Sequence, residues 1–432
     1  MTLTPWGDSS QLRERKLAPG QRLSPESVAR SQRARLLGAM VAAVAEHGYE
    51  RTAVKNVVDL SGTSRSAFYA QFANKEDCFA VAVGETVDFA LAEVGRAHAE
   101  AAGDPDAGLG AALTAFAGLV AAQPAAARAC LVEAPVAGGA ALARVEAGDA
   151  AFAGMIQAGF DRSPRHAGQP PAVVRAIVGG VRAVVCRRLR AGGADAVADL
   201  ADDLARWALS YESPAAGLRR PRSRVLDPAP RPPDDDHVER IFAALADVVL
   251  EKGYQATTLD DVAEWSGISL STFYSHFRTK RDAFLAAYDA GTTRTLAAAL
   301  PPFRRAPDWP HGVRAALGGL LTHLARAPEW AHSATVEVLA AGEPGLERRD
   351  RALAALTELL APGQDDFPDA PAIATDAVAG AIFELIRRQV RDRGADRLLD
   401  LLPTATFVAL APFTGADQAA AVANERARRR VR

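Results

Sequence analysis

The feature that most constrains the fold is an internal repeat of about 45 residues. Gly48-Tyr49 and Gly253-Tyr254 lie 205 positions apart. The residues that coincide at this offset, without a gap, are Thr52 with Thr257, Val57 with Val262, Ser61-Gly62 with Ser266-Gly267, Phe68-Tyr69 with Phe273-Tyr274, Phe72 with Phe277, Lys75 with Lys280, and Asp77 with Asp282. A match of this length indicates two copies of one structural unit.

The repeat continues more weakly through the rest of each copy. Glu133 aligns with Glu337 at an offset of 204, and residues 187–195 resemble residues 387–396. The duplication therefore covers a whole module. Between the copies, residues 213–236 hold six prolines, five arginines and an acidic run. Because such a composition cannot pack a core, it predicts a linker.

Both copies are expected to be all-helical. Alanine, leucine, arginine and glutamate dominate, apolar residues recur three and four positions apart, and sustained strand-like alternation is missing. The chain is 49% hydrophobic and 24% charged, an ordinary globular balance. The formal net charge is -2, so any surface that binds nucleic acid must be a local one.

The second copy shows the helical pattern most clearly. A first helix ends at Gly253, a residue that suits a left-handed helix end. A second helix is expected over residues 259–265, followed by a turn at residues 266–268. Ser269 is then placed to cap a third helix over residues 270–277.

The first copy repeats this order, with a second helix over Val54–Leu60 and a turn at residues 61–63. Ser64 is placed to cap a third helix over residues 65–72. Two short helices joined by a glycine-containing turn, with a supporting helix in front, are the elements of a helix-turn-helix. We call the two units the first reader (residues 29–80) and the second reader (residues 237–285).

These residues resemble the N-terminal signature of the TetR (tetracycline-repressor) family of transcriptional regulators. The second copy carries it in Gly253-Tyr254, Thr257-Thr258, Val262-Ala263, Ser266-Gly267-Ile268-Ser269, Thr272-Phe273-Tyr274, Phe277 and Lys280. The first copy carries it in Gly48-Tyr49, Thr52, Val57, Ser61-Gly62-Thr63-Ser64, Phe68-Tyr69, Phe72 and Lys75. It departs from the pattern where Ala53 replaces a second threonine and Lys55-Asn56 replaces an acidic or polar pair.

The resemblance implies an all-α fold of two tandem modules, each a three-helix helix-turn-helix domain followed by a helical regulatory domain. The expected division is a flexible N-terminus (1–28), first reader (29–80), first regulatory domain (84–212), linker (213–236), second reader (237–285), second regulatory domain (289–414) and basic C-terminal tail (415–432). The resemblance also implies a dimer interface from the last two helices of each module. Those helices are expected at about 172–191 with 196–211, and at about 373–391 with 396–411.

The third helix of each reader is expected to enter the major groove of double-stranded DNA. Arg65 is the best candidate to bond guanine, whereas Leu270 at the equivalent position can touch a thymine methyl group but cannot bond guanine. The two readers are therefore expected to read different sequences. The residues predicted to contact DNA are Thr52, Ser64, Arg65, Ser66, Tyr69, Gln71 and Lys75, with Thr257, Ser269, Leu270, Ser271, Tyr274, His276 and Lys280.

Several of these residues are assigned to the phosphate backbone. The resemblance implies that Tyr69, Tyr274, Lys75 and Lys280 contact phosphate. The hydroxyl groups of Thr52 and Thr257 are expected to donate to phosphate at the start of the second helix, where the helix end is positive.

Each regulatory domain is expected to bind a small-molecule effector. Two clusters are candidates to line its pocket: Phe152, Met155 and Phe160 in the first module, and His323, Trp330 and His332 in the second. Packing in the core or placement on the surface is the alternative role for these six residues.

Other functional classes find no support in the sequence. Metal-ligand spacing, phosphate-binding glycine loops and nucleophile motifs are missing, so we expect neither an enzyme nor a cofactor or metal site. We find no apolar run of about 20 residues and no signal peptide, which predicts a cytoplasmic, nucleoid-associated protein. Cys78, Cys130 and Cys186 lie far apart, which favours reduced thiols over a redox-sensing pair.

The function that we predict is a sequence-specific DNA-binding transcriptional regulator, a repressor relieved by its effector. Two arrangements remain open: an intramolecular pseudo-dimer, suited to an asymmetric operator, or a homodimer with four readers. A linker of about 24 residues can span at most about 80 Å, and half-sites one helical turn apart are about 34 Å distant. The alternative function is a helical ligand-binding or protein-interaction scaffold in which one or both readers are degenerate.

Overall fold

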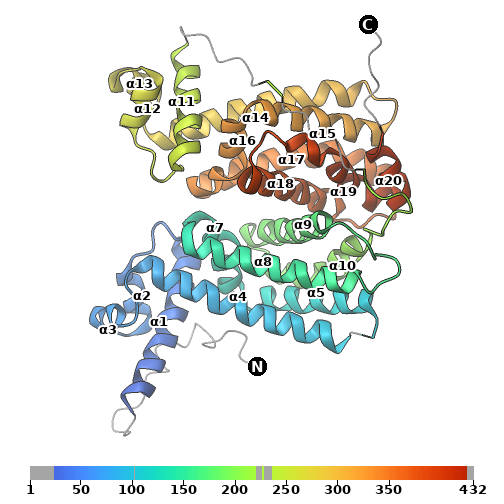
Figure 1. The fold of residues 1–432 in the computed structure, drawn as a ribbon. Helices are drawn as coiled ribbons and strands as arrows, with labels where there is room; N and C mark the ends of the chain where they lie inside the picture. The colour runs from blue at the N-terminus through green and yellow to red at the C-terminus, as the bar shows by residue number, and fades with distance from the viewer. Residues whose placement is uncertain (1–23, 102, 220–225, 228–235, 426–432) are drawn as a thin grey trace. The chain divides into compact units, whose positions relative to one another are not determined.

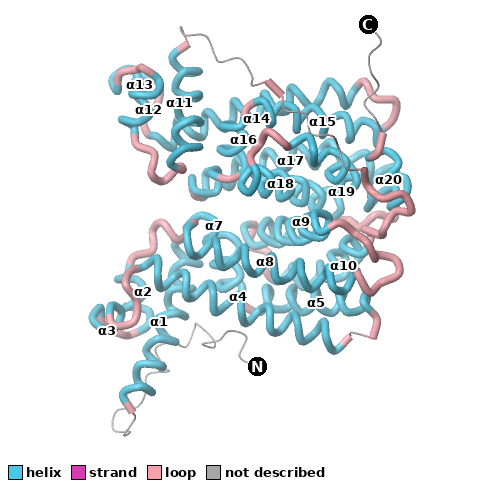
Figure 2. The backbone as a smooth tube through the Cα atoms, viewed as in Figure 1, coloured by secondary structure: helices cyan, strands magenta, loops and turns pink. Residues whose placement is uncertain are grey.

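The computed structural model describes residues 24–101, 103–219, 226–227 and 236–425. Throughout this part of the chain the regular structure is helical, and no strand is present (Figure 1, Figure 2). The all-α fold of two tandem modules is therefore confirmed. The N-terminal residues 1–23 and the arginine-rich end, 426–432, lie outside the described residues.

The first module contains nine α-helices and a π-helical segment within its described residues up to 190. They are α1 (Pro25–His47), α2 (Val54–Ser61), α3 (Arg65–Tyr69), α4 (Lys75–Glu100), α5 (Pro105–Ala122), α6 (Pro124–Arg128), η2 (Ala129–Glu133), α7 (Ala134–Ala137), α8 (Gly139–Phe160) and α9 (Pro171–Arg190). The 3-10 helix η3 (Asp195–Leu200) and α10 (Ala201–Leu209) complete it.

The second module repeats this order along the chain. It consists of α11 (His237–Lys252), α12 (Leu259–Ser266), α13 (Leu270–His276), α14 (Lys280–Arg304), α15 (Trp309–Arg326), α16 (Pro328–Thr335), the 3-10 helix η4 (Glu337–Ala341), α17 (Glu343–Asp366), α18 (Ala374–Arg393), the 3-10 helix η5 (Leu398–Leu401), α19 (Leu402–Thr414) and α20 (Ala416–Ala423).

Local sequence signals place the ends of the reader helices. Ser24 caps α1, Pro25 occupies the first turn, and the helix ends at Gly48, whose φ of 78° is accessible mainly to glycine. One end differs from the prediction. We expected the third helix of the first reader to reach Phe72, but α3 ends at Tyr69 and the chain continues as a turn to Gln71.

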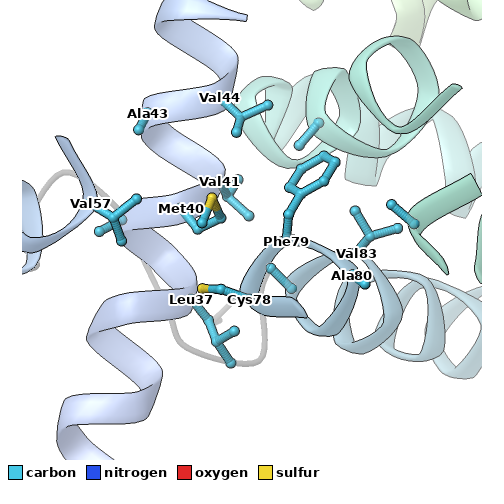
Figure 3. Packing of buried hydrophobic residues seen from close by; sticks show 14 of the residues in the cluster. Leu37, Met40, Val41, Ala43, Val44, Val57, Cys78, Phe79, Ala80 and Val83 are labelled. Carbon is cyan, nitrogen blue, oxygen red and sulfur yellow. The ribbon is translucent and has the colours of Figure 1, made fainter. Parts of the chain in front are cut away.

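A continuous apolar core joins the first reader to its regulatory domain (Figure 3). Leu37, Met40 and Val41 of α1 pack with Val57 of α2 and Phe79 of α4, and all five side chains are buried. Because α1, α2 and α4 share this core, a displacement of α4 would also displace the reader.

Helix α5 corrects the prediction that no segment is apolar enough to cross a membrane. Pro105–Ala122 reaches the length and hydropathy of a span, with 33% of its residues buried. In the structure α5 packs against α4, α8 and η3, and its buried positions include Leu109, Leu113 and Val120. The apolarity of α5 comes from its alanine, leucine, valine and phenylalanine side chains.

The described residues form two compact units by contact, and these do not coincide with the two sequence repeats. The first unit runs up to Pro164 and includes Val184–Ala205. The second unit contains Arg165–Ala183 and the described residues from Arg206 onward. The second unit therefore combines the whole second module with two segments of the first, namely the first half of α9 and the end of α10 with the residues after it.

Close backbone approach joins these segments to α18 within the second unit. Gly180 of α9 and Gly380 of α18 each precede a repeated Arg-Arg pair by seven residues, so they are equivalent positions. A Cβ atom on Gly380 would clash with the side chain of Ala183, and one on Gly180 would lie 2.6 Å from the carbonyl oxygen of Ala377. The two helices therefore cross where both repeats carry glycine.

A buried ion cluster lies beside this crossing. The carboxylate of Glu384 accepts from Arg182 at 3.0 Å and from Arg387 at 2.9 Å. Burial alone would raise the pKa of Glu384, but the two guanidinium groups hold that pKa below its ordinary value. The Tyr211 hydroxyl, fully buried, donates to the carbonyl oxygen of Val408 at 3.0 Å.

The predicted linker and tail both carry more structure than expected. The backbone N–H of Ala215 donates to Asp417 at 2.8 Å, and that of Arg219 donates to Asn424 at 2.7 Å. These acceptors lie on or just after α20, inside the segment predicted as a basic tail. The linker is thus anchored at its start, because two acidic or amide side chains accept its backbone donors.

All three cysteines are buried free thiols. Burial raises the pKa of the Cys130 thiol to about 12, and it also raises the pKa of Cys78. Since the thiolate is the reactive form, the environment of these two cysteines favours inert core packing over redox chemistry.

Candidate DNA interface

The first reader is built by a turn and a cap. Gly62 ends α2 in the left-handed conformation, with φ 61° and ψ 35°. The hydroxyl of Ser64 then accepts the backbone N–H of Ala67 at 3.1 Å and so fixes the start of α3. Phe68 is fully buried and anchors α3, while the next side chain, Tyr69, is 57% exposed.

The second reader has the same geometry and a stronger cap at its second helix. Gly267 repeats the left-handed turn with φ 63°, and Ser269 accepts the N–H of Thr272 at 3.1 Å. Thr258 and Asp261 form a reciprocal capping box at the start of α12. Hydrogen bonds from Lys252 and Thr258 lower the pKa of Asp261 to about 2.

The first reader keeps only half of this capping box. Asn56 accepts the N–H of Ala53 at 2.9 Å, but Ala53 has no side-chain acceptor to return the bond. Its backbone, with φ -112° and ψ 157°, matches that of Thr258. We therefore expect Ala53→Thr to stabilise the first reader by about 1 kcal/mol in urea unfolding. Thr258→Ala is the matched control and should lose a similar amount; a destabilised Ala53→Thr variant would contradict the assignment.

The third helices present different side chains to solvent. Arg65, Ser66 and Tyr69 are exposed on α3, and Gln71 is half-buried in the turn that follows. On α13, Ser271 and His276 are exposed, Leu270 is 37% exposed and Tyr274 is 55% exposed. The residues of α3 and α13 that were predicted to contact DNA are thus exposed to solvent in both readers.

Four exposed cations that were not among the predicted DNA contacts add to the difference between the readers. Arg51 and Lys55 are exposed before and within α2, where the second reader has Ala256 and Asp260. Arg278 and Arg281 are exposed around the start of α14. Their equivalents in the first reader are Ala73 and Glu76. An alignment of the two copies with attention to charge would have revealed this difference.

The two threonines assigned to phosphate have another role in the structure. Thr52 is 2% exposed and Thr257 is 3% exposed. The Thr52 hydroxyl donates to the carbonyl oxygen of Gly48 at 2.8 Å, and the Thr257 hydroxyl donates to that of Gly253 at the same distance. The predicted phosphate contact is thus wrong for this conformation, because both hydroxyl hydrogens are already bonded to the loop before the second helix.

The two lysines assigned to phosphate are also used internally. Lys75 donates to the carbonyl oxygen of Tyr49 at 3.2 Å, and Lys280 donates to that of Tyr254 at 2.7 Å. Each ammonium group lies over the ring of the same tyrosine, at 4.1 Å and 4.5 Å from the centroid. Burial, with a contribution from Arg281, lowers the pKa of Lys280. These lysines cross-link the reader to the next helix instead of pointing freely to solvent.

The second regulatory domain contains an apolar cavity that is partly open to solvent. Its volume is about 110 Å³. Leucines of α15 and α17 and isoleucines of α18 form most of the wall, and Tyr288, Thr295, Trp330 and Thr335 supply the polar atoms near it. Leu320, Leu356 and Ile382 also line a smaller, adjoining apolar space.

Of the six residues predicted to line an effector pocket, Trp330 lies on this cavity wall. His332 pairs instead with Glu337 at 3.3 Å, and His323 is half-buried on α15, whose contribution to the wall comes from leucines. In the first module Phe160 is buried, and Phe152 stacks on Phe116 with 6.3 Å between ring centroids. For these residues the structure supports the alternative of packing.

The profile of the tetR family of bacterial regulatory proteins matches this chain twice, at residues 36–82 and 241–287. The two readers are therefore both similar to the N-terminal DNA-binding segment of this family. Both matched segments run from the first helix through the helix-turn-helix into the fourth helix, which is the part of each module described above.

Comparison with individual TetR-family proteins extends over single modules. The HTH-type transcriptional activator FasR of Mycolicibacterium smegmatis is 27% identical over 104 residues, which are 24% of this chain and 44% of that protein. The alignment therefore spans less than half of that relative. The fatty acid degradation regulator FadR from Bacillus halodurans covers 43% of this chain and 98% of its own, at 18% identity and a TM-score of 0.37. The TetR-family regulator PfmR from Thermus thermophilus covers 40% and 96%, at 18% identity and a TM-score of 0.33.

Proposed function

We propose that this TetR-family chain is a transcriptional regulator that binds an asymmetric DNA site through two unequal readers. The observation that carries the proposal is the exposed face of the third helix in each reader. A serine caps the start of this helix, and a buried phenylalanine, Phe68 or Phe273, anchors it in the core. Arg65 offers a bidentate donor for guanine, and Leu270 offers an apolar contact for a thymine methyl group. If the two half-sites were identical, either Arg65 or Leu270 would face a base that it cannot recognise.

The readers are proposed to hold the phosphate backbone through different elements. In the first reader, exposed cations lie around α2, at Arg51 and Lys55. In the second reader they lie around the start of α14, at Arg278 and Arg281. Tyr69 and Tyr274, each more than half exposed, are proposed to add a hydroxyl donor to phosphate in both readers.

We propose that the two readers are brought together within one chain. Within the second compact unit, the first half of α9 packs on α18. It thereby covers the surface of α18 that a second copy of the chain would need for dimerisation. The charge pattern favours this arrangement over like-with-like pairing. The α18 equivalent of Arg182 is Ile382, so two paired copies of α18 would place the buried carboxylate of Glu384 against isoleucine. Glu384 would then keep Arg387 of its own helix but lose the bond from Arg182, and the loss of a hydrogen-bonded ionic partner from a buried carboxylate disfavours such pairing.

The effector is proposed to be a molecule with an extended apolar part. The cavity of the second regulatory domain is lined almost entirely by aliphatic and aromatic side chains, and such a wall excludes a ligand that is charged along its length. We propose that the effector releases the chain from DNA, so that the regulator represses. A reporter gene behind the selected site should then be induced by the effector and by deletion of the regulator.

Selection of bound sequences from a random DNA library, with the purified full chain, tests this function. We expect a site with two dissimilar half-sites bound by one chain of 45.4 kDa, measured by light scattering of the complex. A strictly palindromic site bound by two chains would contradict the unequal readers and favour a homodimer. Recovery of no sequence motif would instead favour the helical scaffold as the function.

A further inference from the structure

Each module contains a clasp in which a regulatory carboxylate holds the tyrosine before the second helix. Glu133 accepts the backbone N–H of Tyr49 at 2.9 Å, and Glu337 accepts that of Tyr254 at 2.8 Å. On the other side of each tyrosine a lysine, Lys75 or Lys280, bonds its carbonyl oxygen. The two peptide groups that flank each tyrosine are thus both hydrogen-bonded, and the regulatory carboxylate positions the loop that leads into the second helix.

In the second module the carboxylate of this clasp follows directly after a helix that lines the cavity. Trp330 and Thr335 of α16 line the cavity, and Glu337 follows two residues after Thr335. The Trp330 ring donates from Nε1 to Thr295 at 3.1 Å. It fills a notch in α14 at Gly291, where an added Cβ would lie 2.6 Å from the ring. A ligand that displaces Trp330 would therefore push on α16, the short helix that ends at Thr335, two residues before Glu337.

The first module has the clasp without this lever. By the repeat, Trp330 corresponds to Ala126, and Gly291 corresponds to Thr86. Neither the bulky ring nor the notch that receives it is present at these positions. The ion pairs differ as well: Glu133 pairs with Arg128 at 3.2 Å, and Glu337 pairs with His332 at 3.3 Å.

We propose that control by the effector is confined to the second reader, with Trp330 in the Gly291 notch as the lever and Glu337 as the positioning residue that transmits its movement. The first reader then stays ready to bind DNA whether or not the cavity is filled. This inference rests on the proposed function for its biological meaning, but the coupling itself concerns only protein contacts.

A ligand-free test displaces the lever by mutation in the full chain. Gly291→Val should push Trp330 out of its notch, and amide hydrogen exchange by mass spectrometry then reports on both readers. We expect exchange to rise at least tenfold in peptides covering residues 254–276 and to stay unchanged in peptides covering residues 49–71. Thr86→Val is the matched control in the first module, where no tryptophan can be displaced, and should leave both readers unchanged.

The role of Glu337 is tested by combining variants. Glu337→Ala alone should raise exchange in the second reader, and adding Gly291→Val should raise it no further, because the connection is already broken. Glu337→Gln, which keeps an oxygen acceptor for Tyr254, should restore protection. Glu133→Ala should loosen the first reader alone.

Several results would overturn the proposal. They are equal loosening of both readers by Gly291→Val, no loosening of the second reader, or an undiminished effect of Gly291→Val in the Glu337→Ala background. Because exchange requires no DNA, the outcome is separate from that of the library selection. A chain that selects no DNA motif but shows the coupled exchange would refute the proposed function and leave this inference standing.

Discussion

Replacing Glu384 with leucine is expected to lower the free energy of unfolding of the second compact unit by about 3–5 kcal/mol. The variant leaves two largely buried guanidinium groups, Arg182 and Arg387, without the carboxylate that they share. Arg387 is 3% exposed, so water cannot replace the lost bonds. Urea unfolding followed by circular dichroism measures the loss as an earlier transition.

A triple apolar variant separates the stability of this cluster from its specificity. Arg182→Met, Glu384→Leu and Arg387→Met together remove all three charges, and such replacements are often neutral or stabilising by about 1–4 kcal/mol. Arg96→Ala, which removes an exposed cation paired with Glu93 and Glu100, is the control and should leave the transition in place. A triple variant as unstable as Glu384→Leu would show that shape, not charge, explains the loss.

The same cluster makes stability depend on pH with a definite sign. The folded pKa of Glu384 lies below its ordinary value, so the folded state favours the ionised carboxylate. Its contribution is complete above the unfolded pKa of about 4.3 and is lost as the pH falls through the lower folded pKa. The parent chain should therefore lose stability relative to the triple variant on acidification.

Local signals in the sequence were sufficient to predict the readers. Gly62 and Gly267 end a helix in a conformation that favours glycine, and Ser64 and Ser269 cap the next helix within three residues. Each of these effects involves neighbours in the chain, so spacing alone reveals them. The exposed positions of Arg65 and Leu270 follow from the same spacing, because Phe68 and Phe273 fix which face is buried.

Contacts that belong to no sequence motif explain what the sequence did not reveal. Thr52 and Lys75 were predicted to bind phosphate because their residue types suit it. In the structure both side chains donate to backbone carbonyl oxygens of the loop before α2, Thr52 to Gly48 and Lys75 to Tyr49. The Arg182–Glu384 pair joins residues 202 positions apart, and neither belongs to a recognisable motif. The cavity likewise depends on how five helices, α14 to α18, pack together, and of the predicted pocket residues only Trp330 lies on its wall.

The second large effect concerns DNA. Arg65→Ala is expected to weaken binding to the selected site by about 1–3 kcal/mol, roughly 5- to 150-fold, and to relax the preference at one guanine. The loss should appear in one half-site only, because Leu270 occupies the equivalent place in the second reader. Fluorescence anisotropy with the site and with single-base variants measures both the affinity and the discrimination.

Lys55→Ala is the matched control for a contact that carries no sequence information. Lys55 is exposed on α2 of the same reader, and it is proposed to meet phosphate rather than a base. We expect it to weaken all sites about equally and to reduce the slope of affinity against salt by about one ion. If Arg65→Ala behaved in the same way, with uniform loss across base variants and a smaller salt slope, then Arg65 would be a phosphate contact. The asymmetry of the two readers would then lie in their cations, around α2 in one and α14 in the other, and not in base recognition.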